Sequence, residues 1–196
     1  MFAYRNLRTT NMKKHNGMRP LDIVVLSKII AYGHDEWKTR NLSNDLGISL
    51  SEISESLNRS MIAGLIDNEK RKVFRNNLLD FLQHGVKYVF PAIPGPLSIG
   101  TPTAHSAPFF QAQFISNEAF VWPNPEGSIR GQVIEPLYVS VANAVKNDPI
   151  LYEILASIDI LRIGRPREIK LANQALRTLF DASVQPDLLQ IKAEKP

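Results

Sequence analysis

The chain has 196 residues, a net charge of +4 and no cysteine. Disulfides, thiolate metal sites and cysteine nucleophiles are therefore excluded. Apolar residues make up 44% of the sequence and charged residues 21%, which is typical of a folded globular protein with a core of useful size. No apolar run approaches the roughly 20 residues that span a bilayer. We therefore expect no membrane span and a cytoplasmic location.

The positive charge is confined to the first half of the sequence. Residues 1–90 carry 14 basic and 9 acidic side chains, whereas residues 91–196 carry 9 and 10. The first 20 residues contain five basic side chains and no acidic one, and we interpret residues 1–18 as a basic arm. Such an asymmetry favours a polyanionic partner for the N-terminal half.

Apolar spacing and chain breakers divide residues 19–90 into short elements. Pro20 suits the first turn of a helix, and Gly33, Gly47 and Gly85 suit the points where helices end. The pattern predicts helices over residues 19–32, 39–46, 49–65 and 76–84, a turn with a short basic strand over 67–75, and a strand over 86–90.

A helix-turn-helix pattern lies between Asn41 and Asp67, which reads NLSNDLGISLSEISESLNRSMIAGLID. Gly47 stands where the backbone must leave the first helix with a positive φ angle. Ser49 and Glu52 have the spacing of a capping box that starts the second helix. The apolar positions predict which side chains hold the helices together: Leu42, Leu46, Ile48, Ile53, Leu57 and Met61 or Ile62.

This segment resembles the core of winged helix-turn-helix regulators, particularly the bacterial MarR-like type. The resemblance implies that the second helix reads the major groove of double-stranded DNA and that the basic strand forms a wing on the phosphates. The residues expected to bind DNA are Thr39, Arg40, Ser51, Ser54, Glu55, Asn58, Arg59, Lys70, Arg71, Lys72 and Arg75. Two acids, Glu52 and Glu55, depart from a purely basic reading helix. They leave open a winged helix that binds protein instead.

Composition changes over residues 91–136, which hold 8 of the 13 prolines together with aromatic residues such as Phe110, Phe114 and Trp122. Proline is not tolerated inside helices, so this segment is not expected to be helical. Its aromatic side chains favour a segment that packs on folded protein. Residues 137–196 return to helical spacing, with helices predicted over 137–146, 148–161 and 166–182. Their apolar faces exceed what three short helices bury alone, so a partner subunit or the N-terminal domain must cover them. Symmetric DNA half-sites favour the subunit, and we expect residues 137–182 to supply the dimer interface. The alternative is that the N-terminal arm and the first helix dimerise.

Other polar clusters give little support for an enzyme. Thr101, Thr103, His105 and Ser106 lie close together, but they lack a nucleophile-elbow glycine pattern and a third triad member. No phosphate loop or paired-histidine metal motif occurs. Arg162, Arg165 and Arg167 form a basic corner around a helix turn. We expect no catalytic residue, no cofactor and no metal.

The sequence thus predicts a mainly α, α+β protein with four regions: a basic arm (1–18), a winged helix-turn-helix domain (19–90), a proline- and aromatic-rich connection (91–136) and a C-terminal helical region (137–196). The predicted function is a homodimeric, DNA-binding transcriptional repressor. The alternative is an antitoxin-like or adaptor protein that binds a partner protein through residues 91–182 and autoregulates its operon.

Overall fold

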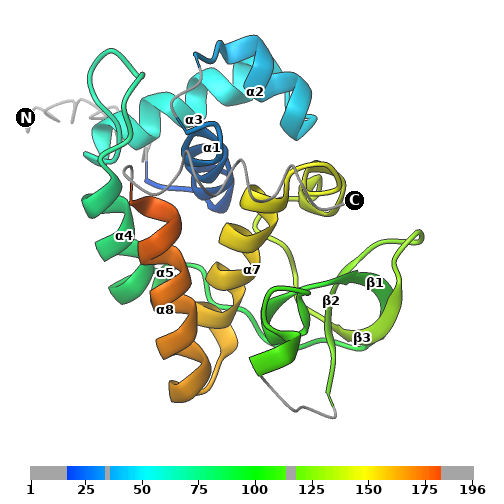
Figure 1. Cartoon of the computed structure of the whole chain (residues 1–196). Helices are drawn as coiled ribbons and strands as arrows, with labels where there is room; N and C mark the ends of the chain where they lie inside the picture. The colour runs from blue at the N-terminus through cyan, green and yellow to red at the C-terminus, as the bar shows by residue number, and fades with distance from the viewer. Residues whose placement is uncertain (1–16, 34–35, 114–117, 182–196) are drawn as a thin grey trace, which may run out of the picture.

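The computed structural model describes residues 17–33, 36–113 and 118–181 (Figure 1). The predicted basic arm therefore lies almost entirely outside the described residues. The described residues form helices and one small sheet, which confirms the α+β class. Their elements are α1 (Pro20–Ala31), α2 (Thr39–Leu46), α3 (Leu50–Ile62), α4 (Arg75–His84), α5 (Val86–Val89), β1 (Leu97–Pro102), η1 (Ala104–Ser106), η2 (Gln111–Gln113), β2 (Phe120–Pro123), β3 (Ile129–Val133), α6 (Val141–Ala144), α7 (Pro149–Ile163) and α8 (Pro166–Phe180).

Helix α1 is the centre of the first half and is buried on all sides from Leu21 to Ala31. Helices α2 and α3 pack against it, and α7 contacts it from the second half of the chain. A helix that is apolar all round belongs in a core rather than on a surface. The two halves accordingly share one continuous hydrophobic core, with α1 seen end-on near the middle of Figure 1.

The predicted strand over residues 86–90 is wrong, because Val86–Val89 forms the single helical turn α5. The amide of Phe90 donates to the carbonyl of Val86 (2.9 Å), and the amide of Val89 donates to the carbonyl of Gly85 (3.1 Å). Val86 is buried, and the Phe90 ring lies edge-on to Phe81, with centroids 6.3 Å apart. Tertiary packing therefore overrides the β propensity of this apolar run.

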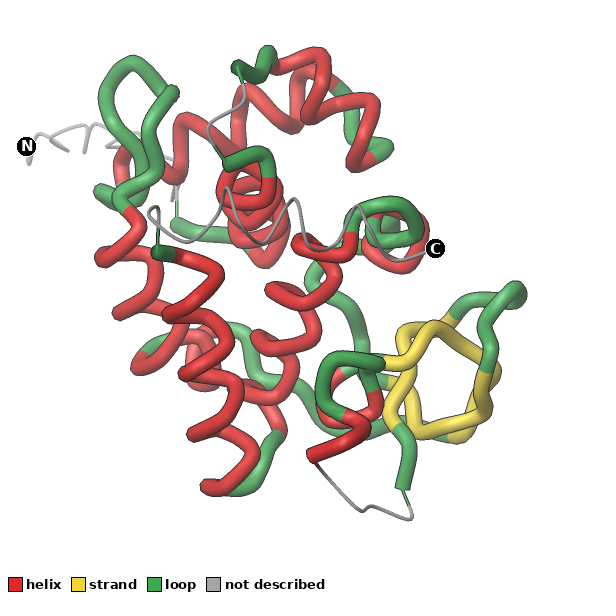
Figure 2. The backbone as a smooth tube through the Cα atoms, viewed as in Figure 1, coloured by secondary structure: helices red, strands yellow, loops and turns green. Residues whose placement is uncertain are grey.

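The proline-rich segment contains a three-stranded sheet that closes on itself (Figure 2). Strand β1 pairs antiparallel with both β2 and β3, while β2 and β3 pair in parallel. The ring is so tight that a Cβ on Gly127 would overlap the backbone of Gly100. Only glycine allows two backbones to approach this closely.

The prediction that this segment packs on folded protein is confirmed for its described residues. Phe110, Phe120 and Trp122 are all buried in the common core. Phe114 lies outside the described residues. The described part of the segment is therefore a folded unit attached to the helices, and its prolines stand in strands, turns and loops.

Helix α7 organises the second half of the molecule. It begins at Pro149, one residue after Asp148, whose carboxylate accepts from the amide of Leu151 (2.8 Å). It packs against α1, α5, α8 and η1, and it is buried on nearly every side from Ile150 to Arg162. The predicted helices over 148–161 and 166–182 are confirmed as α7 and α8. The helix predicted over 137–146 is reduced to α6, a single turn.

The apolar side chains that we assigned to a dimer interface are buried within one chain. Ile154, Leu155 and Ile158 of α7 and Leu176 and Leu179 of α8 are each no more than 2% exposed. Helices α1, α4 and α5 and the short turn η1 pack against α7, and α4 and α7 pack against α8. The apolar pattern of the tail therefore does not require a second subunit.

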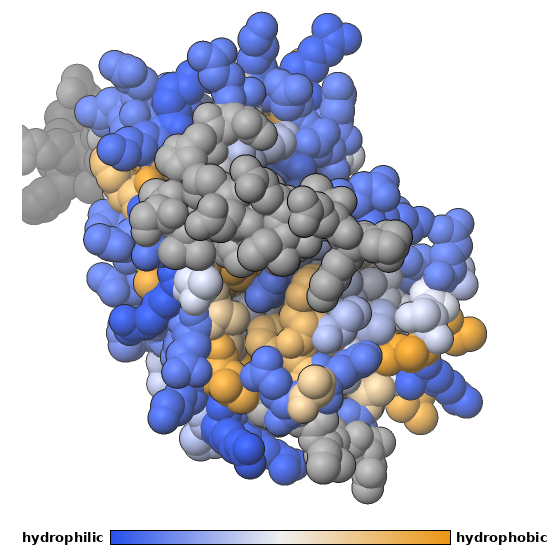
Figure 3. Space-filling view, in the orientation of Figure 1, coloured by the Kyte–Doolittle hydropathy of each residue, from blue (hydrophilic) through white to orange (hydrophobic). Residues whose placement is uncertain are grey.

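The described surface is mixed in character. Hydrophilic side chains predominate at the left edge of the view in Figure 3, over α4, and hydrophobic ones gather near the middle and at the lower right, over the sheet. Leu97 and Ile99 of β1 are 60% and 54% exposed. Among the described helices, none combines the length and the apolar character that crossing a bilayer requires.

Candidate nucleic-acid interface

The turn between α2 and α3 has the local geometry that the sequence predicts. Gly47 adopts φ +63°, in the left-handed region where a side chain would be strained. Leu42, Leu46 and Ile48 are all buried beneath the turn. The Ser49 hydroxyl then accepts from the amide of Glu52 (3.2 Å), so α3 starts at a defined residue.

Helix α3 presents a polar stripe to solvent. Ser51, Ser54, Glu55 and Asn58 are exposed and lie three or four residues apart, on one side of the helix. Ile53 and Leu57 are buried on the opposite side, against α1 and α2. The predicted exposure of these four side chains is confirmed.

The prediction for Arg59 is wrong, because this side chain is buried rather than exposed. Its Nη2 lies 2.6 Å and its Nε 2.9 Å from the carboxylate oxygens of Asp22 in α1, which is itself fully buried. Hydrogen bonds to Asp22 raise the pKa of Arg59 further above its ordinary value, although burial opposes them. Adjacent helical residues point about 100° apart, so Asn58 and Arg59 do not share a face.

A signal for this pair exists in the sequence. Asp22 is an acidic residue inside the otherwise apolar stretch Leu21–Leu26, and a carboxylate in that position needs a cationic partner. The pair holds α3 against α1 from within. Arg59 is thus a positioning residue for the exposed stripe.

A β-hairpin follows α3 and has the place that we predicted for a wing. Ile66 and Val73 form an antiparallel bridge, and the amide of Phe74 donates to the carbonyl of Leu65 (2.9 Å). At its tip the Asp67 carboxylate accepts from the amides of Arg71 (2.6 Å) and Lys72 (3.1 Å). This carboxylate turn fixes the direction of the basic side chains that follow.

The basic residues of the hairpin point in different directions. Lys70 adopts φ +58° and donates through Nζ to the side-chain oxygen of Asn58, which ties the hairpin to α3. Arg71 donates to the carbonyl of Trp37 (3.0 Å), and its guanidinium lies 5.5 Å from the centre of the Trp37 ring. Lys72 is exposed.

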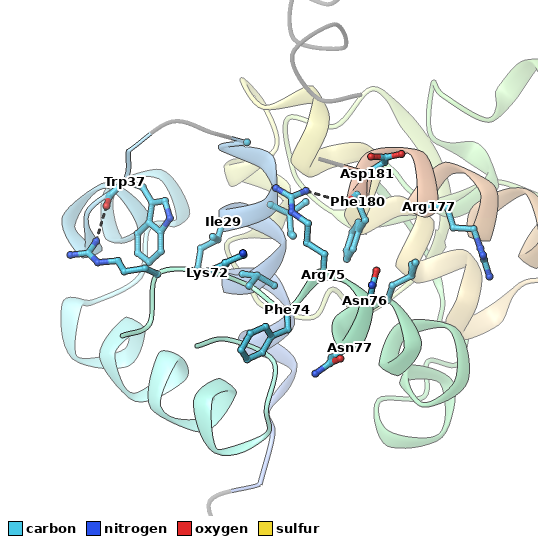
Figure 4. Close-up of a pocket in the computed structure, with 15 residues that line it drawn as sticks. Ile29, Trp37, Lys72, Phe74, Arg75, Asn76, Asn77, Arg177, Phe180 and Asp181 are labelled. Atoms are coloured by element: carbon cyan, nitrogen blue, oxygen red, sulfur yellow. Dashed lines mark hydrogen bonds between the residues drawn. The ribbon is translucent and has the colours of Figure 1, made fainter. Parts of the chain in front are cut away.

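We predicted that Arg75 belongs to the basic strand. This is wrong, because Arg75 is the first residue of α4. Its Nη1 donates to the carbonyl of Phe180 at the end of α8 (3.3 Å), and burial lowers its pKa. Figure 4 shows this side chain between the hairpin and α8. Thr39 and Arg40 open α2; Thr39 is partly buried and Arg40 is exposed.

The C-terminal half touches the helix-turn-helix directly, through residues that we did not single out. The Lys28 ammonium of α1 lies 3.0 Å from Asp45 of α2 and 2.9 Å from Asp148 at the start of α7. The Ser140 hydroxyl donates to the carbonyl of Leu46 (2.5 Å). The orientation of α2 is therefore linked to the second half, and no local pattern reveals such long-range contacts.

The polar cluster around His105 serves the structure. Thr103 donates to the buried carboxylate of Asp159 in α7 (2.8 Å), and the Ser106 hydroxyl accepts from the amide of Phe120 (2.9 Å). The His105 ring bonds the carbonyl of Glu118 (2.9 Å). These contacts fasten η1 and the sheet to α7.

Asp159 is the centre of a buried network that the sequence did not reveal. It also accepts from Trp122 Nε1 (2.6 Å) and from Arg162 Nη1 (2.7 Å), and Arg162 donates to the carbonyls of Phe90 and Glu135. Burial raises the pKa of the Asp159 carboxyl, whereas Arg162 and the hydrogen bonds from Thr103 and Trp122 lower it. Of the predicted basic corner, Arg162 is thus buried, and Arg165 and Arg167 are exposed.

A groove opens beside the hairpin, between α1, α4 and the end of α8, with a volume of about 1,040 Å³ (Figure 4). Its floor is apolar and includes Ile30 and Phe180, which are buried. Four cationic side chains line it: Arg71, Lys72, Arg75 and Arg177. Comparisons with protein-family models, curated proteins and solved structures gave no match.

Proposed function

We propose that this protein is a transcriptional regulator that reads operator DNA with a winged helix-turn-helix made of α1–α3 and the hairpin. One observation carries the proposal: the capped helix α3 presents a continuous polar stripe next to a hairpin that bears cations. The core behind the stripe is rigid, because Arg59 and Asp22 join α3 to α1. A rigid helix with short polar side chains suits the major groove.

In this function α3 lies in the major groove and the hairpin lies on the neighbouring phosphates. The Asn58 amide has the donor and acceptor needed to read adenine, and Glu55 accepts from the amino group of cytosine. Lys70 exchanges its bond with Asn58 for a phosphate oxygen, which releases the amide for base contact. Glu52 takes no part in reading, because it is committed to Ser49 and to Tyr138.

The regulator acts as a homodimer and represses by covering its operator. A two-fold dimer places one α3 on each of two half-sites separated by about one helical turn, 10–10.5 base pairs. The dimer interface lies outside the buried faces of α7 and α8.

Selection from randomised duplexes with the full-length protein tests the proposal. We expect enrichment of a two-fold symmetric sequence whose half-sites have that spacing. A protein with Ser51, Ser54 and Asn58 all changed to alanine provides the control and should enrich nothing. Recovery of unenriched sequence by the wild-type protein would contradict the proposal.

The adaptor function remains the second candidate, and a specific surface favours it. Exposed apolar side chains follow one another from α5 into β1: Tyr88, Val89, Ile93, Leu97 and Ile99. Ile93 is 86% exposed, which suits a protein contact better than water. Co-expression with the product of an adjacent gene, followed by size-exclusion chromatography of wild-type protein and Ile93→Lys, tests it. A complex that survives Ile93→Lys would contradict this surface.

A further inference from the structure

Helix α8 carries a cationic stripe that the helix-turn-helix does not use. Its inner face is apolar, with Ala172, Leu176 and Leu179 buried against the rest of the fold. Its outer face holds Lys170 and Arg177, which are exposed and lie seven residues apart. Seven residues are close to two turns, so the two side chains point the same way. Arg167, also exposed, extends the stripe toward the start of the helix.

The groove beside the hairpin joins this stripe to the proposed wing. Lys72 of the hairpin, Arg75 of α4 and Arg177 of α8 line the same hollow. Figure 4 shows these three side chains on three separate elements around the groove. Among the described lining residues, the carboxylate of Asp181 is the acidic group, so the groove is strongly positive.

Two further features of the groove favour an anion. Helix α4 begins there without an acidic residue in its first turn, and no described side chain caps its N-terminus. Its first amides therefore add the positive end of the helix dipole to the cations. Burial lowers the pKa of Arg75, and the nearby charge of Asp181 opposes that shift, so this guanidinium lies in poorly solvated surroundings where negative charge is favourable.

We infer that the groove and the outer face of α8 form a second contact with the DNA backbone, beyond the hairpin. This inference rests on the proposed function and extends its footprint along the duplex. The cations come from three elements and lie at separate places around the groove rather than at one point, which suits the repeated phosphates of a strand better than a single anion. Contacts of this type set affinity and position without reading sequence.

The test is the salt dependence of binding to the selected duplex, measured by fluorescence anisotropy between 50 and 200 mM KCl. The variants are Lys170→Gln, Arg177→Gln and their combination, and the matched control is Arg130→Gln, an exposed cation of β3. Each phosphate contact that is lost should reduce the slope of log K against log salt by about 0.9. The double variant should lose about 1.8 without a change in preferred sequence, and Arg130→Gln should match the wild type.

Hydroxyl-radical footprinting provides the second measurement. The double variant should lose protection at the outer flank of each half-site and keep it where α3 binds. An unchanged slope with an unchanged footprint would overturn the inference, provided that Asn58→Ala still impairs the same duplex; the proposed function would then survive. If the wild-type protein binds no duplex, the result contradicts both the proposed function and this inference. Circular dichroism melting confirms that the variants are folded.

Discussion

The two halves of the molecule are specified in different ways. From α1 to α4, helix periodicity, the Gly47 turn and the Ser49 cap are local signals, and each appears where the sequence places it. From β1 to α7, the decisive contacts join residues far apart, as Thr103 and Trp122 do with Asp159. Local patterns therefore define the surface proposed to read DNA, and buried polar contacts define the half that supports it.

The largest expected effect is in the supporting half. Asp159→Ala leaves the buried guanidinium of Arg162 and the donors of Thr103 and Trp122 without their shared acceptor. Removing one partner of a buried ion pair costs about 3–5 kcal/mol, and we expect about 4 kcal/mol here. Urea unfolding measures it, with Asp80→Ala on the exposed side of α4 as the control. A loss below 1 kcal/mol would show that the network does not hold the sheet to α7.

A smaller loss should separate two neighbouring residues of α3. Arg59→Ala should lower the free energy of unfolding by about 3 kcal/mol, because it leaves the Asp22 carboxylate buried without its cationic partner. Asn58→Ala, on the exposed side, should change it by less than about 0.5 kcal/mol. Replacing the pair together, as Asp22→Leu with Arg59→Met, should recover part of the loss. Equal stability of Arg59→Ala and Asn58→Ala would contradict the buried pair.

These two positions also show what the sequence can predict. The spacing of four leucine and isoleucine side chains was sufficient to predict the buried faces of α2 and α3: Leu42, Leu46, Ile53 and Leu57. The same spacing does not predict that Arg59 is buried, because the partner of Arg59, Asp22, lies 37 residues earlier and on another helix. Only the isolated acid in α1 signals that a cation must be buried.

The elements that follow α4 were harder to predict from the sequence, because long-range packing decides them too. Val86, Tyr88 and Val89 have strand propensity, yet one buried valine and the adjoining α4 make them a helical turn. The strands of the closed sheet are short and interrupted by proline, so alternation is not visible in them. The sequence predicted helix α7 but not its position in the fold, because the sequence of a helix that is apolar on all sides does not show which elements cover it.

In the surface proposed to bind DNA, a substitution in the hairpin should change the affinity by a few-fold. Lys72→Gln should reduce the salt slope by about 0.9 and weaken binding to all duplexes alike. Arg71→Gln is the comparison, because its side chain is already engaged by Trp37. A smaller slope change is therefore expected for Arg71 than for Lys72. A loss restricted to one sequence would mean that the hairpin reads bases instead.

The smallest effect should appear at acidic pH, where the two halves meet. Burial raises the pKa of Asp45, but hydrogen bonds from Tyr32 and Lys28 outweigh it and leave the pKa below its usual value. A depressed carboxyl pKa stabilises the fold above the unfolded value of about 3.9 and loses that contribution as the pH falls through the folded value. Urea unfolding from pH 6 to pH 2.5 should show a shallower acid loss for Asp45→Asn than for wild type. Parallel curves would contradict this.

The most direct test of DNA reading by α3 is a competition titration of wild-type protein and Asn58→Ala on the selected duplex and a scrambled duplex. The matched control is Asn44→Ala, an exposed asparagine of α2. We expect the wild type to prefer the selected duplex by about a thousand-fold or more. Asn58→Ala should lose about 1–3 kcal/mol of that preference, and Asn44→Ala should keep it. Equal preference in all three proteins, or none in the wild type, would contradict the central claim.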